Sequence, residues 1–151
     1  MIKIFNGDLL ESGANFICHQ VNCQKVMNSG VAKQIREKFP NVYKKYMSVA
    51  SSKMLGHIQV IQVNDCQYIC NMFAQDRYGY DGKQYTSIEA LKKCFMKLKE
   101  SLNLSHWEDA TIAMPYKIGC VRGGANWDEV YSIIDEVFAN YRVELWRLDR
   151  G

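Results

Sequence analysis

Residues 15–39 read NFICHQVNCQKVMNSGVAKQIREKF and contain, in order, an apolar run, a small flexible loop and a helical repeat. The run 15–20 is short and rich in apolar β-forming residues, so it predicts a strand. Val31, Ile35 and Phe39 recur at helical spacing, which predicts a helix that ends before Pro40. A strand followed by a loop and a helix is the repeating unit of α/β proteins.

The same alternation continues along the rest of the chain. Further apolar runs predict strands at 2–5, 57–63, 67–73, 110–114 and 143–148. Helical periodicity lies between them, at 88–102 and 130–138. This order predicts an α/β layer structure, with helices on both faces of a mainly parallel or mixed sheet. The two adjacent runs around Asp65 predict a hairpin, which favours a mixed sheet.

Length and composition fit one domain, residues 1–151. With 48% hydrophobic and 23% charged residues, the chain has enough apolar material for a packed core, which argues against extensive disorder. No apolar run approaches the ~18 to 20 residues of a bilayer-spanning helix. The N-terminal residues also lack the pattern of a signal peptide. We therefore expect a soluble, cytoplasmic protein, and nothing in the sequence indicates an oligomer.

Cysteine content and charge narrow the class of protein further. The six cysteines are too sparse for a disulfide scaffold, so free thiols are expected. Their spacing lacks the paired CxxC pattern of structural zinc sites, and no metal is expected. The net charge of +3 is dispersed along the chain, unlike the clustered basic face of proteins that bind duplex DNA. Nucleic acid is therefore not an expected partner.

Two glycine-containing loops are candidates for binding an anion. One covers residues 26–32, between a predicted strand and a predicted helix, and the other covers 118–124. Glycine lets backbone N–H groups approach an anion closely, and helix N-termini attract negative charge. Two such loops facing each other could hold a diphosphate, although each by itself could equally be a helix cap or turn. The common nucleotide-binding fingerprints are absent.

Five motifs occur in order along the chain: GDLL at 7–10, HQVNC at 19–23, NSGVA at 28–32, FAQDRYG at 73–79 and AMPYKIGC at 113–120, continuing to GGANW at 123–127. Together they resemble the motifs of the macrodomain family, α/β modules that bind ADP-ribose. The most similar branch holds ADP-ribose 1″-phosphate phosphatases, the terminal ADP-ribose protein glycohydrolase and small phage or bacterial relatives. The resemblance implies a three-layer fold with a mixed, mostly parallel sheet of about six strands between helices.

The resemblance also implies a set of ligand contacts. Asp8 and Leu9 would meet the adenine, the two loops would cover the two sides of the diphosphate, and His19 and Asn22 would lie by the distal ribose. No cofactor is implied. The implied ADP-ribose-binding residues are Asp8, Leu9, Gln20, Asn22, Ser29, Gly30, Val31, Ala32, Ile118, Gly119, Cys120, Val121, Arg122, Gly123 and Gly124.

The candidate catalytic residues are His19, Lys83 and Asn126. In the phosphatase branch a histidine at the position of His19 has a proposed catalytic role, and a neutral imidazole can act as acid or base. The alternative is a buried histidine bonded to the backbone. Lys83 lies near the lysine of the glycohydrolase branch, but Gly123 and Asn126 stand where relatives have acids. Because Asn cannot take a proton, lysine-based chemistry is in doubt.

These observations leave several functions open. The first hypothesis is an ADP-ribose-binding macrodomain that hydrolyses an ADP-ribosyl derivative, either ADP-ribose 1″-phosphate or a protein-linked ADP-ribose ester. The alternative is a non-catalytic reader of ADP-ribose on proteins. A third, a surface for RNA or poly-ADP-ribose, depends only on the small positive charge and scattered tyrosines. The size of the chain suits a phage or bacterial source.

Overall fold

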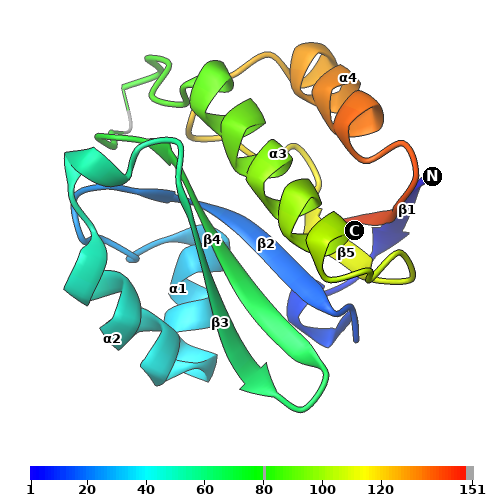
Figure 1. Cartoon of the computed structure of the whole chain (residues 1–151). Coiled ribbons are helices and arrows are strands. Elements are labelled where there is room, and N and C mark those ends of the chain that lie inside the picture. Colours follow the sequence, from blue (N-terminus) through cyan, green and yellow to red (C-terminus); the bar gives the residue numbers. More distant parts are fainter. Residues whose placement is uncertain (80, 149–151) are drawn as a thin grey trace.

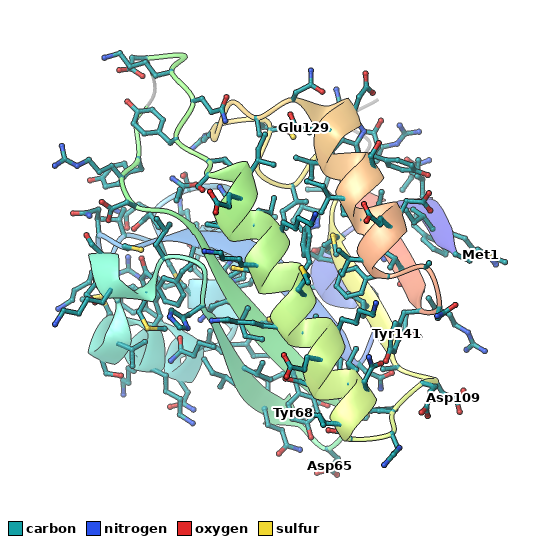
Figure 2. The ribbon with its side chains drawn as sticks, turned by 45° about the horizontal axis from the view of Figure 1, so that its top comes forward. Met1, Asp65, Tyr68, Asp109, Glu129 and Tyr141 are labelled. Carbon is teal, nitrogen blue, oxygen red and sulfur yellow. The ribbon has the colours of Figure 1, made fainter. Side chains whose placement is uncertain are left out.

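The computed structural model describes residues 1–79 and 81–148, and its strands form one sheet (Figure 1). The strands are β1 (Ile2–Asn6), β2 (Phe16–Asn22), β3 (Ile58–Asn64), β4 (Gln67–Gln75), β5 (Thr111–Pro115) and β6 (Arg142–Arg147). Their order is β1-β6-β5-β2-β4-β3, and only β3 and β4 pair antiparallel. The predicted mixed, mostly parallel sheet is confirmed, and Figure 2 shows Asp65 at the tip of the predicted hairpin.

Helices cover both faces of the sheet, as Figure 1 shows. The helices α1 (Gly30–Lys38) and α2 (Pro40–Val49) pack on one face, and α3 (Ile88–Leu104) and α4 (Trp127–Val137) pack on the other. Two short 3-10 helices, η1 (Leu9–Glu11) and η2 (Ser52–Met54), lie in the connections. The chain therefore has the predicted three layers.

The helix α2 is absent from the sequence-based prediction, which took Pro40 only as the end of a helix. Instead Pro40 is the first residue of α2. Proline is well tolerated there, because an N–H group in the first turn has no partner within the helix. The chain turns at Phe39, whose N–H closes α1 on the carbonyl of Ile35 at 2.7 Å.

The central strand β2 is buried on both faces, as expected for a strand between two helical layers. Successive side chains of a strand point to opposite faces. Ile17 packs with the core under α1, whereas Cys18 packs with the core under α3. Continuing this alternation, His19 faces the α1 and α2 layer and Gln20 faces the α3 layer. Both residues lie near the carboxyl end of β2, beside the candidate site.

The state of the cysteines and the character of the helices can be read from the described residues. All six cysteines are free thiols, and four of them are buried. None of the helices in residues 1–79 and 81–148 has the length and apolar character needed to cross a membrane.

Candidate functional site

A cavity of about 440 Å³ opens where the parallel strands end. Ligand sites of open α/β sheets gather at the carboxyl ends of strands, and this volume is within the usual range for small-molecule sites. Both candidate anion-binding loops line the cavity, so segments about 90 residues apart in sequence meet there. The sequence-predicted residues that line it are Asp8, Leu9, His19, Gln20, Asn22, Ser29, Gly30, Val31, Ala32, Ile118, Gly119, Cys120, Val121, Arg122 and Gly123.

Some predicted site residues do not line the cavity, and some residues that line it were not predicted. Lys83, Gly124 and Asn126 are not among the residues that line the cavity. Conversely, Trp146 and Arg147 line it but were not predicted. They end β6, so their position at the carboxyl end of a predicted strand was the signal that could have identified them.

The N-terminus of α1 forms one side of the cavity and has an unusual cap. Ser29 is the N-cap residue, but its side chain makes no capping hydrogen bond, whereas Ser87 caps α3 and Asn126 caps α4. The first-turn N–H groups of a helix have no partners within the helix, and they carry the positive end of its dipole. No acidic residue lies in the first turn of α1. This side of the cavity therefore offers unoccupied donors to an anion.

The loop 118–124 forms the opposite side, and two of its carbonyl groups bond residues 85 and 86. The Gly119 carbonyl accepts from Thr86 Oγ1 at 2.7 Å, and the Gly123 carbonyl accepts from the N–H groups of Tyr85 and Thr86 at 2.7 and 3.0 Å. Within the described part of the chain, the N–H groups of Val121 and Gly123 have no protein acceptor. Backbone amides without an acceptor in a glycine-containing loop can bind an anion.

Gly123 is required by packing. A Cβ at this position would collide with Thr86 Oγ1 and with the Gly119 carbonyl. Gly119 is restricted too, because its φ of +76° is left-handed and a Cβ would lie 2.9 Å from Gln20 Oε1. The aspartate that the glycohydrolase branch has at the position of Gly123 does not fit this loop arrangement.

His19 is 1% exposed and lines the cavity. Its Nε2 lies 2.5 Å from Asn71 Oδ1, and its Nδ1 has no hydrogen-bond partner among the described residues. Burial lowers the pKa of His19 to about 4, so the imidazole is neutral near pH 7. The histidine is buried as one sequence-based alternative expected, but its partner is a side chain and not the backbone. A buried acceptor without a partner costs about 1–3 kcal/mol, which is unusual outside functional sites.

Asn22 lines the cavity, but its side chain is occupied by the protein. Asn22 Nδ2 donates to the Val26 carbonyl at 2.8 Å, and Oδ1 accepts from the Gln24 N–H at 2.9 Å and from the Tyr46 hydroxyl at 2.9 Å. These bonds hold the start of the loop that leads to α1. The resemblance implies that the Asn22 side chain orients a ribose. Both of its polar atoms already bond the protein, so a ribose would have to share or replace these partners.

Two candidate catalytic residues lie outside the cavity. Lys83 Nζ lies 3.8 Å from Asp81 Oδ2, and the Lys83 side chain is 77% exposed. Asn126 Oδ1 accepts from the Glu129 N–H at 3.0 Å and so caps α4, at the helix start where Figure 2 labels Glu129. Among residues 1–79 and 81–148, no group of three or more His, Cys, Asp or Glu side chains is arranged to hold a metal ion.

Comparisons with known proteins agree with this geometry. The family model described as Macro domain matches residues 18–134. The chain is 28% identical over 152 residues to a DNA ADP-ribosyl glycohydrolase of Thermus aquaticus, covering 97% of this chain and 40% of that protein. It is 31% identical over 144 residues to an uncharacterized 17.5 kDa protein of Enterobacteria phage T4, covering 89% and 88%.

A solved structure has the same fold. Thermosipho africanus DarTG in complex with ADP-ribose superposes with a TM-score of 0.81 at 18% identity, over 99% of this chain and 42% of that one. The chain spans only 36–40% of the length of the curated glycohydrolases that it matches.

Proposed function

We propose that this chain, which belongs to the macro domain family, binds ADP-ribose in the cavity and hydrolyses an ADP-ribosyl derivative. Membership of the family confirms the resemblance seen in the sequence. The observation that carries the proposal is the pair of donor surfaces on opposite sides of one cavity, the uncapped start of α1 and the loop 118–124. A diphosphate presents only acceptor oxygens and negative charge, which these N–H groups match.

The remaining parts of the ligand have chemically suitable neighbours. Asp8 Oδ1 accepts from the Leu10 N–H at 2.9 Å, which leaves the second carboxylate oxygen to accept from the adenine amino group. His19, near the carboxyl end of β2, lines the same cavity and offers Nδ1 to sugar hydroxyls or to water. The name of the Thermosipho complex, which includes ADP-ribose, supports this choice of ligand.

Hydrolysis adds water to the bond that joins the ADP-ribosyl group to its carrier, and yields ADP-ribose and the free carrier. The carrier is a phosphate in ADP-ribose 1″-phosphate and a carboxyl group in a protein-linked ester. Because the curated relatives are named DNA ADP-ribosyl glycohydrolases, ADP-ribosylated DNA is a third substrate class. His19 is the candidate to accept the proton of the attacking water, because it is neutral near pH 7 and its Nδ1 has no partner among the described residues.

The second candidate function, a reader without turnover, is favoured by three observations. Lys83 is exposed and paired with Asp81, Asn126 is a helix cap, and Gly123 leaves no room for an acid. A reader needs only the donor surfaces and the adenine and ribose contacts.

Calorimetry with ADP-ribose, followed by incubation with the three substrate classes, tests the proposal. We expect micromolar affinity, about −8 kcal/mol, and release of ADP-ribose from at least one substrate. His19→Gln is expected to reduce turnover more than affinity, and a loss of turnover in Lys83→Ala with none in His19→Gln would reject the histidine as the base. Binding without turnover of any substrate would establish the reader. Absence of ADP-ribose binding would overturn both functions.

A further inference from the structure

A line of hydrogen bonds crosses the sheet from α2 to His19. The cross-strand register places His19 of β2 beside Asn71 of β4, and Asn71 beside Gln59 of β3. Asn71 Nδ2 lies 3.0 Å from Gln59 Oε1, and Gln59 Nε2 lies 3.0 Å from the Lys45 carbonyl of α2. Asn71 is fully buried.

The direction of every bond in this line follows from its last member. The Lys45 carbonyl oxygen can only accept, so Gln59 must present its NH₂ group to it. Gln59 then presents Oε1 to Asn71, which must donate through Nδ2. Asn71 in turn presents Oδ1 to His19 Nε2 at 2.5 Å.

A carbonyl oxygen facing Nε2 requires that Nε2 carries the proton. A neutral imidazole has one N–H, so Nδ1 then carries a bare lone pair. This is the nitrogen that has no partner among the described residues, and it belongs to a side chain that lines the cavity. The hydrogen-bond line assigns the proton to Nε2, and the absence of a described partner at Nδ1 leaves that lone pair available to a molecule in the cavity.

We infer that Asn71, oriented by Gln59, is a positioning residue that holds His19 as the Nε2–H tautomer and makes Nδ1 the acceptor for a ligand hydroxyl or water. In this tautomer Nδ1 has no proton to donate, so His19 presents only an acceptor to the cavity. The tautomer is a property of the unliganded protein, whereas the acceptor role depends on the proposed function.

Nitrogen-15 NMR of the imidazole rings tests the tautomer directly. The chain has three histidines, so the His19 signals are identified by their loss in His19→Gln. At pH 7 we expect a protonated Nε2 and an unprotonated Nδ1 in the unmodified protein. A protonated Nδ1, or averaged shifts at both nitrogens, would overturn the inference.

Two variants test the positioning role. Gln59 is only partly buried, so Gln59→Leu should fold, yet it frees the Asn71 amide to rotate and should produce a mixture of His19 tautomers. Asn71→Asp keeps an acceptor but adds charge, and should protonate both nitrogens at pH 7. Asn64→Asp, at the exposed end of β3, introduces the same charge change and should leave His19 unaltered. Unchanged His19 signals in both Gln59→Leu and Asn71→Asp would refute the role of Asn71.

Titration with ADP-ribose separates this inference from the proposed function. If calorimetry detects binding, the Nδ1 signal should shift on saturation, and Gln59→Leu should bind about tenfold more weakly, or about 1.4 kcal/mol. Binding without a shift at Nδ1 would overturn the acceptor role alone. No binding by the unmodified protein would overturn the proposed function, while the tautomer measurement would still decide the role of Asn71.

Discussion

Replacing Tyr46 with Phe removes one hydroxyl that anchors the loop between β2 and α1. Tyr46 is fully buried, and its single O–H is shared between the Asn22 carbonyl at 2.7 Å and Asn22 Oδ1 at 2.9 Å, while the hydroxyl oxygen accepts from the Val26 N–H at 3.1 Å. Burial also holds the pKa of this hydroxyl well above its ordinary value, so it remains a donor. Only a longer 3.4 Å contact with Asn22 Oδ1 would remain for the Val26 N–H.

The loss can be worked out from these bonds. Each net hydrogen bond contributes about 1 kcal/mol, and a poorly paired buried N–H adds a similar cost, so we expect Tyr46→Phe to lower the unfolding free energy by about 2–3 kcal/mol. For a chain of this size the melting temperature should fall by roughly 5–10 °C. ADP-ribose affinity should also fall, because the loop carries one donor surface of the cavity.

Urea and thermal unfolding followed by circular dichroism measure this effect. Tyr43→Phe is the matched control, since Tyr43 lies one turn away on α2 and is only partly buried. Stability of Tyr46→Phe within about 0.5 kcal/mol of this control would refute the reasoning, because that is the usual range for surface substitutions.

Three further changes probe the two loops and His19. Gly123→Ala should cost about 1–3 kcal/mol in thermal unfolding through collision with Thr86 Oγ1 and the Gly119 carbonyl. In a Thr86→Ala background the loss should be smaller, because only the collision with the Gly119 carbonyl remains, and equal losses would contradict the contribution of Thr86. Ser29→Asp should stabilise α1 by about 0.5–1 kcal/mol as a cap, yet weaken ADP-ribose binding at least tenfold in calorimetry, unlike Ser87→Asp away from the cavity. Unchanged affinity would exclude the anion site. Because burial lowers the pKa of His19 to about 4 from 6.5, the unfolded chain takes a proton first as pH falls, and stability should decline by about 2 kcal/mol from pH 7.5 to 5. Urea unfolding of His19→Gln should lack this decline, and a parallel pH dependence would contradict it.

Local sequence patterns predicted most of the fold, because strand and helix periodicity is a property of neighbouring residues. The six strands were placed to within one or two residues, and the hairpin around Asp65 was expected. The exception was α2, where Pro40 was interpreted as a stop although the same residue is compatible with a helix start. Proline is excluded from the interior of a helix but tolerated in its first turn. Its presence therefore marks a helix boundary without indicating whether a helix ends before it or begins at it.

The sequence also indicated the two candidate anion-binding loops and their order, since glycines and a strand-to-helix change are visible in the chain itself. That the loops line one cavity depended on the sheet order β1-β6-β5-β2-β4-β3, which brings together strand ends far apart in sequence. Tertiary structure likewise decided that Lys83 and Asn126 do not line this cavity, and their side chains contact Asp81 and the Glu129 N–H instead.

What only the tertiary structure decided is the chemical state of His19. Its partner Asn71 is 52 residues away, and the bond that orients Asn71 comes from Gln59 on a third strand. The sequence shows that His19 lies in an apolar strand. The charge of its imidazole and the nitrogen that carries the proton depend on burial and on acceptors from other elements. These contacts arise from cross-strand register, which no local pattern of residues contains.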